Sequence, residues 1–189
     1  RGKDYKIYIK KLGDVSKIKI DSFEGLKKAI EERLIYFIKN GCRLTDHGLE
    51  KIYFCKANEK EIENIFQKAL NEKEITYEEN EKFITAFMIF MGQICSKHDI
   101  IMQLHYDCLR NVNSNAFIKI GADSGFDCIG GIESPLSLIK FLDELEKNNY
   151  LPKTILYSLN PSNNAVIDVI CGCFNGKVFS KIQHGCAWW

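Results

Sequence analysis

The chain has 189 residues, enough for one domain with a real core, and its hydrophobic share of 46% and charged share of 27% are ordinary for a globular protein. Its 26 basic and 25 acidic residues are spread along the sequence and give a net charge of +1, which argues against the basic surface that nucleic-acid binding requires. No apolar run approaches the roughly 20 residues of a membrane helix, and no signal-peptide pattern opens the chain, so we expect no membrane partner.

The first predicted helix covers residues 22–39. Apolar residues recur on one face at helical spacing, Asp21 and Glu24 have the spacing of a capping box, and an Asn-Gly pair provides a natural stop. A short strand is predicted directly after this helix, at residues 42–45, and it ends in the polar pair Asp46-His47.

The alternation of helices and strands continues to the end of the chain. Further helices are predicted at residues 59–71, at 77–97, from Pro135 through Leu145 and at 163–174, and further strands at residues 100–104, 154–159 and 181–185. The glycine-rich stretch 111–133 is predicted to be a long loop, of the kind that is usually functional or flexible.

Apolar strands that alternate with helices predict an α/β fold with a parallel sheet covered on both faces. The polar residues cluster where each strand ends, which is the edge at which parallel barrels and doubly wound sheets both build their sites. No glycine-rich phosphate loop follows any strand, so the nucleotide-binding alternative lacks its main signal. We expect residues 1–189 to form a single domain.

The eight cysteines lie mostly within apolar runs, and none belongs to a CxxC pair. Such cysteines usually behave as small buried apolar residues in a reducing compartment, which favours a cytoplasmic location. Cys171 and Cys173 are close enough to share a metal or redox role. However, no second ligand pair at zinc-like spacing accompanies them, so this role is disfavoured.

His105 and Arg110 are the leading candidates for a functional site. A histidine at a strand end can bind a divalent metal or carry a proton, and an arginine just beyond it can hold a carboxylate through two parallel hydrogen bonds. Asp46 and His47 offer a carboxylate beside an imidazole. Neighbours on a strand face opposite ways, so only one of this pair is expected to point toward the site. From spacing alone, a purely structural role stays open for both pairs.

The other polar and aromatic candidates also have structural interpretations. Asp123 and Asp127 lie in a glycine-rich segment, where aspartate commonly stabilises turns. The pair Trp188-Trp189 is suited either to cover the apolar face of a sugar ring or to pack in a core. His184 is more typical of a core histidine, and His98 of a solvated helix end.

Five segments, taken together, resemble the uronate (glucuronate) isomerase family in the same order along the chain. They are NGCRLTDHGL at 40–49, QLHYDCLRN at 103–111, GFD at 125–127, LPKTILYSLNP at 151–161 and KIQHGCAWW at 181–189. The resemblance spans nearly the whole chain, from Tyr5 to Trp189. Any one segment would be weak evidence, whereas five in order are strong.

The resemblance implies a metal-dependent barrel of the amidohydrolase type. By their order, the predicted strands correspond to the fourth to seventh strands of a (β/α)8 TIM barrel, so the chain would form a partial barrel of consecutive βα units. The implied reactions interconvert D-glucuronate with D-fructuronate and D-galacturonate with D-tagaturonate. The implied partners are a hexuronic acid substrate and a divalent metal, either zinc or manganese.

Several residues match functional positions of that family. Arg110 matches an active-site arginine and would bind the substrate carboxylate. His105 matches a histidine near the metal, either as a ligand or as a residue that holds a bound water, and Trp188 matches a tryptophan close to the site. Asp46 and His47 match a family motif and are, with His105, the candidate catalytic residues.

The first and last strands of the family barrel, which carry its main metal ligands, have no counterpart in this sequence. The abrupt first residue and the Trp-Trp end also favour an internal segment of a longer enzyme, which need not bind a metal on its own. An open half-barrel would expose two strand edges, so we expect a homo-oligomer. The alternatives are an inactive fragment that only self-associates and a related metal-dependent hydrolase or decarboxylase.

Overall fold

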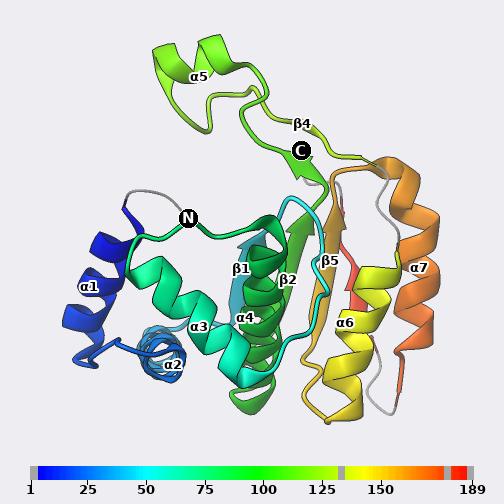
Figure 1. Ribbon diagram of the computed structural model, residues 1–189. Helices are drawn as coiled ribbons and strands as arrows, with labels where there is room; N and C mark the ends of the chain where they lie inside the picture. The colour runs from blue at the N-terminus through cyan, green and yellow to red at the C-terminus, as the bar shows by residue number, and fades with distance from the viewer. Residues whose placement is uncertain (1–3, 132–134, 177–179, 187–189) are drawn as a thin grey trace. The chain divides into compact units, whose positions relative to one another are not determined.

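The computed structural model describes residues 4–131, 135–176 and 180–186. By internal contacts the chain divides into a helical unit, Arg1–Arg43 with Tyr53–Ile94, and a sheet unit, Leu44–Ile52 with Cys95–Trp189. Figure 1 traces the elements of each unit along the chain. The expectation of one domain over residues 1–189 stays a prediction.

The helical unit contains α1 (Tyr5–Ser16), α2 (Phe23–Lys39), α3 (Glu59–Leu70) and most of α4 (Tyr77–Lys97). The sequence patterns locate α2, α3 and α4 closely, whereas α1 has no predicted counterpart. The predicted cap of α2 is wrong by one residue. Ser22 rather than Asp21 caps this helix, because the Ser22 Oγ accepts the backbone N–H of Gly25 at 3.1 Å. Among the described residues, no helix has the length and apolarity that crossing a bilayer requires.

Phenylalanine rings fill the core of the helical unit. Phe66 is fully buried in one cluster with Ile9 and Leu26. The ring of Phe23 lies 5.3 Å from that of Phe83 in an edge-to-face arrangement, and 6.3 Å from that of Phe66. Tilted ring contacts of this kind stabilise a core beyond the apolar area that they bury. They therefore join helices that are far apart in the sequence.

The sheet unit is built on a parallel sheet whose strands follow chain order. In the described part of the chain, these strands are β1 (Leu44–Gly48), β2 (Ile101–Tyr106), β5 (Thr154–Ser158) and β6 (Ile182–His184), paired in the order β1-β2-β5-β6. The predicted α/β class with a parallel sheet is thus confirmed. The first strand begins two residues later than predicted, and it contains Asp46 and His47 instead of ending before them.

Register and burial give this sheet two different faces. Leu104 of β2 and Leu156 of β5 are register neighbours, and both are fully buried. The next residues, His105 and Tyr157, are also neighbours and stay partly exposed. Since side chains alternate along a strand, one face is apolar and the other is polar. We call the second face the polar face and define it by Asp46, Gly48, Gln103, His105, Tyr157 and Gln183, with Ile155 as an apolar member between Gln103 and Gln183.

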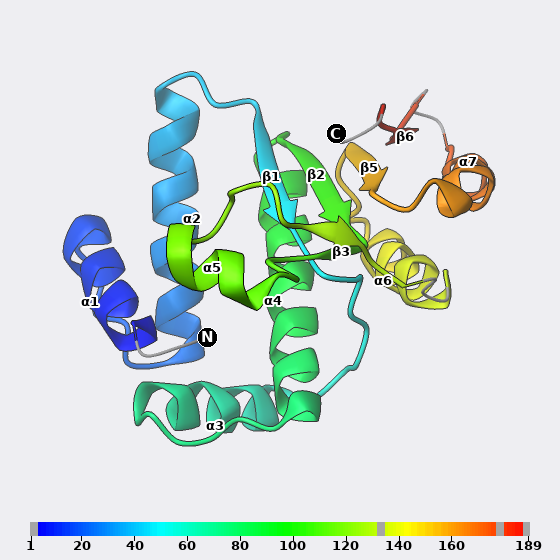
Figure 2. The same ribbon diagram turned by 90° about the horizontal axis from the view of Figure 1, so that it is seen from above.

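Helices α6 (Leu136–Lys147) and α7 (Asn164–Cys173) lie on one side of the sheet (Figures 1 and 2), and the 3-10 turn η1 (Pro161–Asn163) precedes α7. Both helices line a cavity of about 20 Å³ together with Tyr106, which belongs to the apolar face. These helices therefore cover the apolar face, and they leave a cavity with room for about one water.

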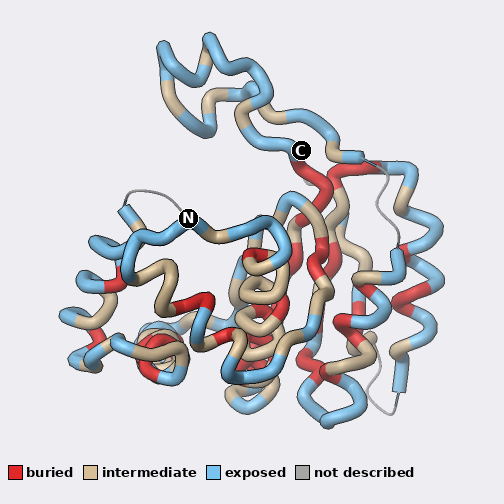
Figure 3. Tube along the Cα trace, in the orientation of Figure 1, coloured by how far each residue is buried: buried red, intermediate tan, exposed pale blue. Residues whose placement is uncertain are grey.

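The long loop predicted after β2 is in fact structured. The predicted loop contains α5 (Ser114–Ile120) and the short strand β4 (Cys128–Ile129), which pairs antiparallel with β3 (Cys108–Leu109) just before the loop. Residues 111–131 are exposed or intermediate throughout (Figure 3). We call residues 108–131 the β3–β4 arm. Its two-residue strands are too short to produce an alternation pattern, which is why the sequence predicted a loop.

We predict that Leu156→Ala lowers the free energy of unfolding by about 2–5 kcal/mol, because it opens a cavity between the sheet and its helices. Urea unfolding followed by circular dichroism would measure this. Val169→Ala is the matched control, since Val169 is 68% exposed on α7 and its truncation should cost less than about 0.5 kcal/mol. Equal losses in the two variants would contradict the assignment of the core.

Candidate active site

Asp46 and His105 form a hydrogen-bonded pair on the polar face. The parallel register of β1 and β2 places Gly48 opposite His105 and Asp46 opposite Gln103, so all four residues share this face. The Asp46 Oδ1 lies 2.6 Å from the His105 Nδ1, and the side chains are 63% and 14% exposed, respectively. The structure thus unites two candidates that are 59 positions apart in the sequence.

Tyr157 of β5 supports the imidazole of His105 from the next strand. The two rings stack with centroids 4.3 Å apart and an angle of 11° between their planes. The phenol of Tyr157 donates a hydrogen bond to Gln103 Oε1 at 2.8 Å. Next to it, Gly185 follows β6, and a Cβ at this glycine would overlap the Tyr157 ring. The sequence analysis did not single out Tyr157. Its position within the third predicted strand, residues 154–159, could have identified it as a candidate.

His47 lies on the apolar side of the sheet, away from the Asp46–His105 pair. Its register neighbour is the buried Leu104, and its Nε2 lies 3.0 Å from Thr45 Oγ1. The Thr45 hydroxyl is in turn 3.5 Å from the Sγ of Cys95. Burial lowers the pKa of His47 to about 4, against a smaller opposing effect of Asp46. A catalytic role for His47 stays a prediction, and its surroundings are those of a partly buried imidazole that favours the neutral form.

Arg110 extends from the end of β3 and is held by an ion pair within the β3–β4 arm. Its Nη1 lies 2.6 Å from the Oδ2 of Asp127 and 3.8 Å from the Oδ1 of Asp123. A Cβ placed on Gly48 would lie 3.5 Å from the Nη2 of Arg110. Since Gly48 is the register neighbour of His105, the guanidinium lies near the end of the polar face that carries the Asp46–His105 pair.

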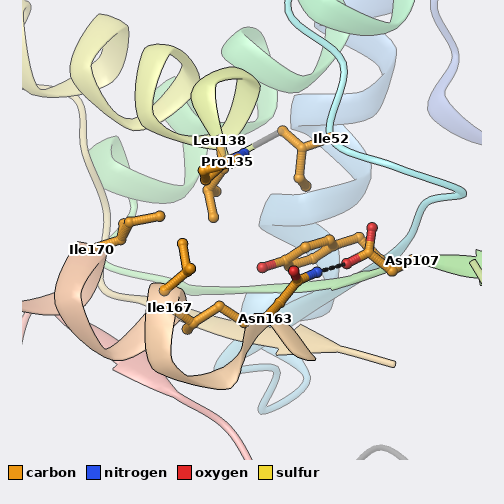
Figure 4. A pocket seen from close by; sticks show the side chains of 9 residues that line it. Ile52, Asp107, Pro135, Leu138, Asn163, Ile167 and Ile170 are labelled. Atoms are coloured by element: carbon orange, nitrogen blue, oxygen red, sulfur yellow. Dashed lines mark hydrogen bonds between the residues drawn. The ribbon is translucent and has the colours of Figure 1, made fainter. Parts of the chain in front are cut away.

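Asp107 is a buried carboxylate beside the candidate residues, and the sequence analysis did not single it out. Its side chain is fully buried, and its carboxylate accepts hydrogen bonds of 2.6 Å from Ser158 Oγ and from Asn163 Nδ2. Figure 4 shows the bond from Asn163. Its backbone N–H donates to the carbonyl of Glu50, and its carbonyl accepts from Gly130. Asp107 therefore links the residues that follow β1, β2 and β5 to the base of the β3–β4 arm. Its position between the two leading candidates, His105 and Arg110, could have identified it in the sequence.

The remaining candidates contribute less to this arrangement. His184 is half-buried and pairs with Asp168 of α7, with 2.7 Å between Nδ1 and Oδ1. Trp188 lies outside the described residues. All the cysteines are free thiols, but the expected burial holds for only part of them, because Cys128, Cys173 and Cys186 are exposed.

The described residues do not form a complete metal centre. They contain no group of three or more His, Cys, Asp and Glu side chains placed to hold a metal ion. The imidazole of His105 is hydrogen-bonded to Asp46 on the polar face, so it could supply at most one metal ligand. Its role as a metal ligand stays a prediction.

Comparisons with known proteins bear on the whole length of the chain. A family model described as glucuronate isomerase matches residues 1–189. The uronate isomerase of Clostridium perfringens is 48% identical over 186 residues, and that of Endomicrobium trichonymphae is 47% identical over 186 residues. Each match covers 98% of this chain and 40% of the relative. The chain thus spans about 40% of the length of these curated relatives.

Solved structures agree in fold. The uronate isomerase of Thermotoga maritima superposes with a TM-score of 0.90 at 23% identity, over 100% of this chain and 40% of that one. The glucuronate isomerase of Caulobacter crescentus gives a TM-score of 0.85 at 22% identity, over 100% of this chain and 38% of that one. At such identities the likeness establishes the fold.

We predict that His47 makes stability depend on pH below neutrality. Above pH 6.5, folded and unfolded chains both carry neutral His47. Between pH 6.5 and about 4 only the unfolded chain takes up the proton, so the free energy of unfolding falls as pH drops, by on the order of 3 kcal/mol. Urea unfolding at several pH values, compared between the wild type and His47→Gln, isolates this effect. An unchanged pH slope in the variant would contradict it.

Proposed function

Because the chain belongs to the glucuronate isomerase family, we propose that the protein interconverts hexuronic acids as aldose and ketose. The reactions are D-glucuronate to D-fructuronate and D-galacturonate to D-tagaturonate. The observation that carries this proposal is the Asp46–His105 pair, which places an oriented imidazole on a polar, partly exposed sheet face. A carboxylate-binding arginine near the same end of that face fits a substrate that is both a sugar and an acid.

The architecture proposed for the intact protein is a (β/α)8 TIM barrel in which these strands are the fourth to seventh. The parallel sheet in chain order, with α6 and α7 together on one side of it, supports this. In such a barrel the polar face would line the interior, and the site would form at the carboxyl ends of the strands. In the described chain, His105 and Gly48 lie at or next to those ends.

Proton transfer is assigned to the Asp46–His105 pair. Aldose–ketose isomerisation moves a proton between C2 and C1 through an enediol-like intermediate, and it needs a positioned base. A carboxylate beside Nδ1 favours the tautomer with its proton on that nitrogen, so Nε2 becomes the basic nitrogen. The stack with Tyr157 fixes the plane of the His105 imidazole, and with it the direction in which Nε2 points.

Substrate binding is assigned to Arg110 through the carboxylate. Its planar guanidinium suits a carboxylate, and its side chain is 42% exposed. Trp188 is proposed as a wall for the sugar. A divalent metal, zinc or manganese, would polarise the carbonyl oxygen when bound. Its ligands would have to come mainly from outside the described residues.

We predict C2 deuterium exchange of D-glucuronate by the protein expressed from its complete reading frame. Arg110→Ala should lower kcat/KM by roughly 100-fold, since removing one member of a charged, hydrogen-bonded pair leaves its partner unpaired. Exchange followed by NMR, with and without chelator, would measure this. Arg43→Ala is the matched control, because Arg43 is exposed and its guanidinium donates to the backbone carbonyl of the adjacent Cys42.

No exchange by a folded, metal-loaded protein would overturn the isomerase and leave the barrel architecture standing. Turnover of an amide or a lactone in its place would favour the hydrolase alternative. Equal losses in the Arg110→Ala and Arg43→Ala variants would remove Arg110 from the substrate site.

We also predict that residues 1–189, produced alone, self-associate. The strands β1 and β6 end the described sheet, and strand edges pair readily with other chains. Sedimentation velocity over a range of concentrations should show species larger than the 21.8 kDa monomer. A monodisperse monomer at all concentrations would contradict this, together with the proposed homo-oligomer that depends on these edges.

A further inference from the structure

Gln103 of β2 connects two strands of the polar face through its side chain. It lies two residues before His105, so both side chains are on the same face of the sheet. Its Oε1 accepts a hydrogen bond of 2.8 Å from the phenol of Tyr157, which is the register neighbour of His105 on β5. The amide of Gln103 and the imidazole of His105 therefore contact the same tyrosine, one at its hydroxyl and the other at its ring.

The ring of Tyr157 has little freedom to move. It stacks on the imidazole of His105 with 4.3 Å between the centroids, and a Cβ built on Gly185 would lie only 2.1 Å from its Cε1. Burial is the largest of the effects that raise the pKa of Tyr157, so the phenol keeps its proton at neutral pH and acts as the donor. The Oε1 of Gln103 is thus the acceptor that fixes the hydroxyl end of this ring.

The orientation of the His105 imidazole depends on two different contacts. The bond of 2.6 Å between its Nδ1 and the Oδ1 of Asp46 holds one atom of the ring, and a single bond of this kind still lets the plane of the ring turn about it. The stack on Tyr157, with 11° between the two planes, restricts that turning. Proton transfer requires its donor and acceptor in a narrow range of geometries, so the plane of the imidazole affects the rate.

We propose that Gln103 is a positioning residue for the proposed base, which holds the phenol of Tyr157 and, through the stacked ring, the plane of the His105 imidazole. This inference rests on the proposed function, which assigns proton transfer to the Asp46–His105 pair. Gln103 needs no contact with the substrate for this role, because it acts through the phenol. Loss of the bond between Gln103 and Tyr157 should therefore slow proton transfer and leave substrate binding nearly unchanged.

The test uses Gln103→Met, Tyr157→Phe and the double variant, each in the protein expressed from its complete reading frame. Methionine is close to glutamine in size but its thioether is a weak acceptor, and phenylalanine keeps the stacked ring without the hydroxyl. Gln183→Met is the matched control, since Gln183 lies on the same polar face and its Nε2 donates to the Ser180 carbonyl at 3.4 Å. Single-turnover loss of a C2 deuterium from D-glucuronate, with enzyme in excess, gives the rate constant at saturation and the Kd.

The expected result is a rate constant roughly 10-fold lower in each single variant, an effect of the size common for partners that orient a reactive group. The double variant should be no slower than the single variants, because all three lack the same hydrogen bond. The Kd of D-glucuronate should stay nearly constant, and Gln183→Met should change the rate constant by less than about twofold. A merely structural role would reduce the amount of folded enzyme, which does not alter a rate constant measured at saturating enzyme.

Three outcomes would overturn the inference while the isomerase stands: an unchanged rate constant in either single variant, a loss in the double variant equal to the product of the single losses, or an equal loss in Gln183→Met. A higher Kd with an unchanged rate constant would likewise overturn it and make Gln103 a substrate-binding residue. If Gln103→Met does not fold, Tyr157→Phe decides, because it removes the same bond from the other side. Absence of isomerisation by the wild type would overturn the proposed function and this inference with it.

Discussion

Side chains alternate between the faces of a strand, and the parallel register of β1, β2 and β5 keeps this alternation in step across the sheet. The buried pair Leu104 and Leu156 packs under the helices on one side. On the other side His105 meets Asp46 and Tyr157. A slip of one residue between β1 and β2 would move the carboxylate to the apolar side and leave His105 without it. The apolar packing therefore determines the geometry of the polar face.

The buried carboxylate of Asp107 has a complementary effect at the strand ends. It joins Ser158 and Asn163, while its backbone bonds Glu50 and Gly130. Its φ of 63° lies in the left-handed region, where the chain leaves the direction of β2 and starts the β3–β4 arm. The direction in which Arg110 leaves the sheet thus depends on a buried polar network. In the proposed site, where His105 lies on a strand and Arg110 on the arm, this network would fix the position of the arm relative to the strand.

The order of helices and strands was predictable because long apolar periodicities dominate the local signal, as in α3 and α4. His105 was chosen because it lies at the end of a predicted strand, and Arg110 because it lies just beyond that end. The partners of both residues could not be predicted. The bond between Asp46 and His105 depends on the pairing of β1 with β2, and that of Arg110 with Asp127 on the short strands of the arm. Both contacts arise from tertiary pairing, which no local pattern encodes.

Gly185 affects the position of His105, the proposed base, through the ring of Tyr157 that lies between them. The ring of Tyr157 occupies the volume that any larger residue at 185 would need, and the same ring lies flat against the imidazole of His105. The absence of a side chain at Gly185 thus leaves space for the Tyr157 ring. That ring in turn sets the orientation of the His105 imidazole on another strand. A search of this chain for reactive side chains would not select Gly185, although a methyl group added there would overlap the Tyr157 ring that stacks on the imidazole of His105.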